Sequence, residues 1–173
     1  MAYIRREELR IYAEQNFEQG QRLEALARVA AQVVTVFLSH SHYDPTLIRW
    51  AKTVLLNHRV AVYIDREDGT LPRITSSVTA NAIRNRILSC QKFVMVASEQ
   101  ALDSHWIAWE LGFADGIRAS QSMAILPVRE HYGEWQGTEY VGLYPTIQNE
   151  GNFWWVIAPD GSRLNYLGEW LTS

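Results

Sequence analysis

The sequence has one cysteine in 173 residues, so no disulfide can form within the chain. This absence favours a reducing compartment, and we expect Cys90 to be a small buried residue at the entry to a strand. Long apolar runs are also missing, since no segment approaches the roughly 20 residues of a membrane span. The charged first ten residues do not resemble a secretory signal. The sequence therefore predicts a cytoplasmic protein that does not enter a membrane.

An excess of positive charge is missing too. The chain carries 16 basic and 19 acidic residues, a net charge of −3, and shows no basic stripe that would indicate a nucleic-acid partner. No strand is followed by G-x-G-x-x-G, and G-x-x-x-x-G-K-[ST] is absent, which argues against a hydride-transferring dinucleotide enzyme or a nucleoside triphosphatase. The length suits one domain, since single domains usually have about 100–200 residues.

What the chain does contain is an alternation of strand and helix patterns. Helix starts are indicated at Asp44-Pro45, at Thr75 or Ser76, and at Ser104. Such alternation predicts crossover connections and a mostly parallel sheet. The segment 129–157 is aromatic and long for a connection. The expected strands are 33–38, 60–64, 93–97, 123–128 and 153–157.

Ahead of the first strand, residues 3–31 have a helical pattern. Because apolar residues recur at helical spacing, we expect one face of this helix to be buried. We predict a helical extension, residues 1–31, that packs on the domain of residues 32–173 or on another copy of it. The residues expected on the buried face are Leu9, Tyr12, Ala13, Phe17, Leu23, Leu26, Ala27 and Ala30.

Polar residues follow several predicted strands, at the edge of the sheet where ligands of such folds bind. On the helix after the third strand, Glu110 shares a face with Trp106. A carboxylate suits glycosidic chemistry because it stabilises an oxocarbenium-like centre, although an isolated helix glutamate is also typical of a solvated surface. His40 and His42 allow a metal site, but we predict none, because such a site usually needs three protein ligands. They are interpreted either as polar pocket residues or as ordinary loop histidines.

Four segments resemble the Toll/interleukin-1 receptor (TIR) domain family. The first strand and its loop read VFLSHS at 36–41, and the second strand reads VAVYID at 60–65. The segment after the third strand reads AS at 97–98 and ALDS at 101–104. Residues 104–111, SHWIAWEL, match the family's Ser-x-Trp-x-x-x-Glu motif.

The resemblance implies a flavodoxin-like α/β fold with a parallel five-stranded sheet flanked by helices. It also implies an NAD glycohydrolase or ADP-ribose cyclase of the kind found in bacterial antiphage systems such as Thoeris, with NAD as substrate and no cofactor. Such enzymes release nicotinamide and a cyclic or linear ADP-ribose signal for a partner effector. Glu110 would be the catalytic residue holding the nicotinamide ribose. The implied substrate-binding residues are Phe37, Ser39, His40, Ser41, Asp65, Ser104 and Trp106.

In this family the loop after the second strand, the BB loop, often completes a neighbour's pocket. The corresponding loop here is 66–74, so the resemblance implies self-association through this region. The loop sequence and the pair His40 and His42 depart from the family pattern, and the segment 129–157 has no standard counterpart in it. Two alternatives remain: a non-catalytic TIR adaptor, or a nucleoside deoxyribosyltransferase-like enzyme.

Overall fold

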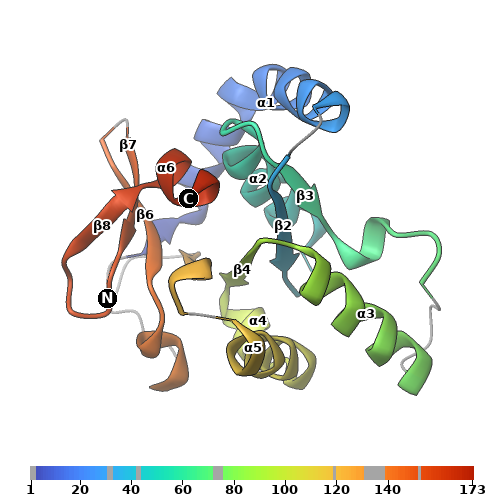
Figure 1. Ribbon diagram of the computed structural model, residues 1–173. Coiled ribbons are helices and arrows are strands. Elements are labelled where there is room, and N and C mark those ends of the chain that lie inside the picture. The colour runs from blue at the N-terminus through green and yellow to red at the C-terminus, as the bar shows by residue number, and fades with distance from the viewer. Residues whose placement is uncertain are drawn as a thin grey trace.

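In a computed structural model of the chain, an eight-stranded, mostly parallel sheet lies between two layers of helices (Figure 1). The structure describes residues 3–30, 33–41, 44–71, 76–118, 120–130, 139–151 and 153–173. The strands are β1 (Ile4–Arg5), β2 (Thr35–Ser39), β3 (Ala61–Tyr63), β4 (Lys92–Ala97), β5 (Met123–Arg129), β6 (Thr146–Glu150), β7 (Phe153–Ile157) and β8 (Arg163–Tyr166). The α-helices are α1 (Arg6–Val29), α2 (Pro45–Leu56), α3 (Ser77–Ser89), α4 (Glu99–Leu102), α5 (His105–Ile117) and α6 (Leu167–Thr172), and three short 3-10 helices are η1 (Asp65–Glu67), η2 (Ser120–Ser122) and η3 (Glu139–Leu143).

The strand order β3-β2-β4-β5-β6-β7-β8 confirms the predicted fold class. Strands β3, β2, β4, β5 and β6 are joined by parallel pairings, and β2 is an inner strand. The predicted fifth strand, 153–157, is wrong in direction, because β7 runs antiparallel to β6 and β8. The physical reason is the short connection after Glu150, where Gly151 has a φ of 69°; parallel strands require a much longer crossover. The fifth parallel strand is β6, which the sequence analysis missed.

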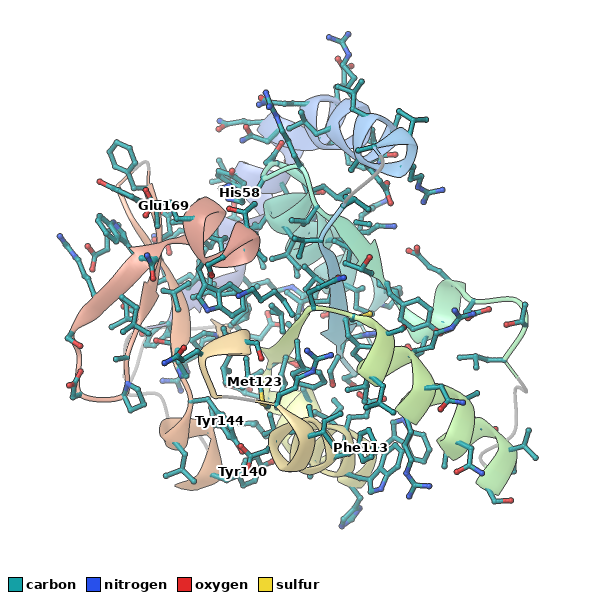
Figure 2. The ribbon with its side chains drawn as sticks, in the orientation of Figure 1. His58, Phe113, Met123, Tyr140, Tyr144 and Glu169 are labelled. Atoms are coloured by element: carbon teal, nitrogen blue, oxygen red, sulfur yellow. The ribbon has the colours of Figure 1, made fainter. Side chains whose placement is uncertain are left out.

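Side chains of the parallel strands alternate between two hydrophobic cores, as the period of a strand requires. Val36 and Leu38 of β2 contribute to the core with α1, α2 and α6, whereas Phe37 lies in the core with α3, α4 and α5. Figure 1 shows α1 and α2 on one side of the sheet and α3 and α5 on the other. In Figure 2, Phe113, Met123, Tyr140 and Tyr144 gather on the second side, and all four belong to that core or pack against it. The core with α3, α4 and α5 is the side that receives Glu110.

Side-chain caps start the helices where the sequence predicts. The Asp44 carboxylate accepts a hydrogen bond from the Leu47 backbone N–H at 2.9 Å, with Pro45 in the first turn. Ser76 caps α3, so the choice between Thr75 and Ser76 is resolved for the latter. Ser104 caps α5 through the Ile107 N–H. These caps fix the first turns of the helices that surround the strand ends.

The N-terminal helix packs on the domain, as predicted, and largely with the expected face, since Leu9, Ala13 and Ala27 are buried. Strand β1 pairs with β5, and α1 lies against α2, where the Cβ of an alanine at Gly20 would be 3.5 Å from Leu56. Phe17 and Leu26 are exposed, contrary to the expected apolar face. Glu24 of α1 is buried, which the sequence did not predict. Its charge is compensated by the Lys52 ammonium, 3.7 Å away, and by a salt bridge with Arg28. Strand β1 and helix α1 therefore contribute to the core of the domain.

Two smaller features concern the ends of elements. Cys90 is buried between α3 and β4, as predicted, and burial raises the pKa of its thiol to about 11. The C-terminal segment forms both a strand, β8, and a short helix, α6. Of the aromatic segment 129–157, residues 131–138 lie outside the described part, and the remainder forms η3, β6 and β7.

Candidate functional site

The Glu110 carboxyl lies at the carboxyl end of the inner strand β2. It comes from the second turn of α5, and its Oε2 accepts a hydrogen bond of 2.6 Å from the Ser39 hydroxyl, at the last residue of β2. Glu110 is only 2% exposed. The interpretation as a solvated helix glutamate is therefore wrong. A ligand can reach the carboxyl only when neighbouring side chains move aside.

Burial dominates the electrostatics of this carboxyl. The pKa of Glu110 is raised to about 8, mainly by removal of the carboxyl from water; the nearby Asp65 charge also raises this pKa, while hydrogen bonds from Ser39 and Trp106 lower it. The side chain is thus mostly protonated at neutral pH in the unliganded protein. A cation bound beside it favours the charged form, so this carboxyl is suited to respond to a positively charged ligand.

His40 and Asp65 form a second pair beside this carboxyl. His40 directly follows β2 and is buried, and its Nδ1 lies 2.9 Å from the Leu38 carbonyl oxygen. Its Nε2 lies 3.7 Å from Asp65 Oδ1, at the end of β3. Because β2 and β3 are parallel neighbours, their carboxyl ends bring Ser39, His40 and Asp65 to the same edge of the sheet as Glu110.

The remaining predicted site residues have clear structural positions. The Phe37 ring lies within the core, with centroids 5.5 Å from Tyr63 and 5.6 Å from Phe93. Ser41 is buried. The Ser104 hydroxyl is used as the cap of α5. Trp106 is partly buried, hydrogen bonds Glu110 and packs on Trp109 at 4.7 Å between ring centroids. Ser39, Asp65 and Trp106 thus act on the Glu110 carboxyl, while Phe37 and Ser104 build the elements around it.

Sequence reasoning missed the contacts that hold the loop after Asp65. The Asp68 carboxylate accepts hydrogen bonds from the Tyr63 hydroxyl and from Arg86, both at 2.9 Å. Its other oxygen accepts from the backbone N–H of Thr70. These bonds hold the pKa of Asp68 at about 2, the Thr70 hydroxyl making the largest contribution. In the sequence, only the Asp-Gly pair indicated a turn in this loop. The hydrogen bond that joins Asp68 to Arg86 of α3 is visible only in the structure.

Metal and membrane roles find no support in the described ranges. Within them, no group of three or more His, Cys, Asp and Glu side chains could hold a metal ion. His42, the other candidate ligand, lies outside them. In the same part of the chain, no helix combines the length and hydrophobicity needed to cross a membrane.

Comparison with known families agrees with this fold and this arrangement of residues. The model of the TIR domain family matches residues 36–151, more than half of the chain. The match runs from β2 through β6, and so includes the strand ends and the helix that form the site. The chain belongs to the TIR domain family.

Two similar proteins are both named as cyclic ADP-D-ribose synthases. The chain is 39% identical, over 120 residues, to a probable 3′ cyclic ADP-D-ribose synthase, ThsB′, of Bacillus cereus, an alignment of 67% of this chain and 61% of that protein. It is 27% identical over 86 residues to a putative cyclic ADP-D-ribose synthase, TIR2, of Cytobacillus dafuensis, covering 48% and 23% of the two chains. The chain therefore spans less than two thirds of the length of either relative.

Proposed function

We propose that this protein cleaves the bond between nicotinamide and ribose in NAD and transfers the ADP-ribosyl group to a hydroxyl. The product is nicotinamide together with a cyclic or linear ADP-ribose. The observation that carries the proposal is the buried Glu110 carboxyl, hydrogen-bonded to Ser39 at the end of the inner strand β2 in a TIR domain. The names of the two relatives, both cyclic ADP-D-ribose synthases, support the same chemistry.

Glu110 supplies the electrostatics of this reaction. The nicotinamide of NAD leaves as a neutral molecule, so positive charge moves onto the ribose as the bond breaks. A carboxylate held in a water-excluded site stabilises that charge strongly, because few solvent dipoles screen it. Ser39 and Trp106 orient the carboxyl through their hydrogen bonds. In this proposal NAD is the substrate, and no cofactor takes part.

The biological setting is part of the same proposal, and the membership of the TIR family supports it. The cyclic or linear ADP-ribose acts as a signal in bacterial antiphage defence and is received by an effector protein. The reaction takes place in the cytoplasm, in keeping with a single buried cysteine. Copies of the protein associate through the region of the loop 66–74.

The experiment is incubation of the purified protein, at high concentration, with NAD, with the products identified by mass spectrometry. We expect nicotinamide and ADP-ribose products to appear in equal amounts. Glu110→Gln is the matched variant, since it keeps the size of the side chain and removes its charge. A wild-type protein that leaves NAD intact over a wide concentration range, with and without a phage-derived trigger, would favour the adaptor alternative.

A further inference from the structure

We propose that His40 is the proton acceptor for the hydroxyl that attacks the ribose, with Asp65 stabilising the imidazolium that forms. The inference rests on the proposed function and assigns a second catalytic residue to the same site. Cleavage of the bond in NAD requires stabilisation of positive charge on the ribose, whereas attack by the acceptor hydroxyl requires removal of its proton. Glu110 serves the first, and the pair of His40 and Asp65 serves the second.

The tautomer of His40 is determined by its contact with Leu38. A backbone carbonyl oxygen can only accept a hydrogen bond, so the Nδ1 that lies 2.9 Å from it carries the proton. In the neutral ring, Nε2 then holds the lone pair. The bond to the carbonyl also fixes the orientation of the ring, which is buried. The side chain is therefore arranged to gain a proton at Nε2.

Asp65 stands on the side of the ring that would receive this proton. Its Oδ1 is 3.7 Å from Nε2, beyond hydrogen-bond length, and both atoms are acceptors while the ring is neutral. When Nε2 is protonated, the same geometry becomes an ion pair in a poorly hydrated site. The attraction appears only as the proton arrives, so it stabilises the transition state more than the ground state.

The pair adjoins the carboxyl assigned to bond cleavage. Asp65 faces His40 and its charge also acts on Glu110, while Ser39, next to His40 in the chain, donates to Glu110. A ribose held at Glu110 thus has His40 within the same group of side chains. The two functions share one edge of the sheet and need no residue from elsewhere in the described chain.

The bond from the ribose carbon to the nicotinamide nitrogen breaks, and its electron pair leaves on nicotinamide, neutralising the positive ring. The acceptor oxygen, from a hydroxyl of the same molecule or from water, forms the new bond to that carbon. Its proton passes to His40 Nε2 and later to solvent. Nicotinamide itself can also attack the ribose, which regenerates NAD and releases no proton.

This difference separates the two roles experimentally. Isotopically labelled nicotinamide is incubated with NAD, and its incorporation into NAD is measured beside the formation of ADP-ribose products. His40→Asn is the sharp variant, because the asparagine amide can still donate to the Leu38 carbonyl while the lone pair of Nε2 is lost. We expect product formation to fall by about 10²–10⁴-fold, the usual contribution of a general base, and exchange to stay within about threefold.

The controls distinguish failure of this inference from failure of the proposed function. His58→Asn alters a partly buried histidine beside α6, on the other side of the sheet from Glu110, and is expected to leave both reactions unchanged (Figure 2). Glu110→Gln should lose both. If wild type shows neither reaction, the proposed function fails, and this inference with it. If His40→Asn forms products at the wild-type rate, or loses exchange and product formation equally, only the role of His40 is overturned.

A second variant protects the test against misfolding. Asp65→Asn keeps the shape of the side chain and removes its charge, so the imidazolium loses its partner. We expect product formation to fall about 10–100-fold and nicotinamide exchange to be largely kept, as for His40→Asn. Unchanged product formation in a folded Asp65→Asn protein would overturn the assignment, whatever the state of His40→Asn.

Discussion

A single buried carboxyl carries the proposed chemistry, and its burial has consequences for both activity and stability. Glu110 is desolvated, and its pKa is raised to about 8, well above the usual range of a glutamate. In the unliganded protein the charged form is therefore disfavoured at neutral pH. A cationic substrate that binds beside the carboxyl lowers its pKa and so favours the charged form.

The first prediction concerns the pH dependence of the reaction. Because the carboxylate is the active form, kcat/KM for NAD should rise with pH and level off above about pH 8, the pKa of Glu110 in the free protein. The kcat profile should be shifted to lower pH, since the positive nicotinamide favours the carboxylate. Initial rates between pH 5.5 and 9.5 test this, with His40 and Asp65 as the other titratable groups facing the site. A profile that falls across this range would contradict it.

The second prediction concerns stability in the variant Glu110→Gln. A raised pKa in the folded state stabilises the fold below the unfolded pKa, and this contribution is lost as pH rises through about 8. Glutamine stays neutral, so its melting temperature should exceed that of wild type above pH 8 by an amount that shrinks towards pH 5. The loss in wild type is on the order of a few kcal/mol, since each unit of pKa corresponds to about 1.4 kcal/mol. Parallel melting curves for the two proteins would exclude the shift.

The same variant gives the third prediction, for catalysis. Loss of one electrostatic partner of a developing charge typically costs about 10²–10³ in rate, or roughly 3–4 kcal/mol. NAD turnover by Glu110→Gln should fall by this factor, while its circular dichroism spectrum stays that of wild type. Normal turnover by the variant would eliminate the proposed mechanism.

At the scale of elements, α1 is part of the domain core, and this can be tested within one helix. Leu9 is completely buried, whereas Leu26 is 63% exposed. Leu9→Ala should lower the free energy of unfolding by about 2–5 kcal/mol, the usual cost of truncating a buried leucine. Leu26→Ala is the matched control and should change it by no more than about 0.5 kcal/mol. Equal effects in urea denaturation would mean that Leu26 is covered, for example by another copy of the chain.

The loop after β3 is a second element with a specific attachment. Asp68 joins it to α3 through Arg86 and to β3 through Tyr63. Asp68→Asn should raise KM for NAD several-fold with a smaller change in kcat, because Asp65 would be held less well in position. Asp160→Asn, which alters a similar turn between β7 and β8, is the control and should leave KM unchanged. A reduced kcat at constant KM would argue against this positioning role.

At the scale of the whole molecule, the proposed self-association has a kinetic signature. If a neighbouring copy completes the site through the loop 66–74, specific activity should rise with protein concentration. The measurement is NAD turnover over a hundredfold dilution series, beside the mass distribution in solution. Constant specific activity together with a constant mass would show that each copy has a complete site.

The sequence by itself determined the fold class and the strands that line the site, and it singled out Glu110 as the candidate catalytic residue. These depend on local signals: buried strands alternate with helices, caps stand at Asp44 and Ser104, and the Ser-x-Trp-x-x-x-Glu motif has a fixed spacing. These features can be predicted from the local sequence, because helix caps and the spacing of apolar residues depend on residues only a few positions apart. The tertiary structure decided the rest. It buried Glu110, paired His40 with Asp65, exposed Leu26 and turned β7 antiparallel, because desolvation, charge pairing and strand direction depend on residues distant in the chain.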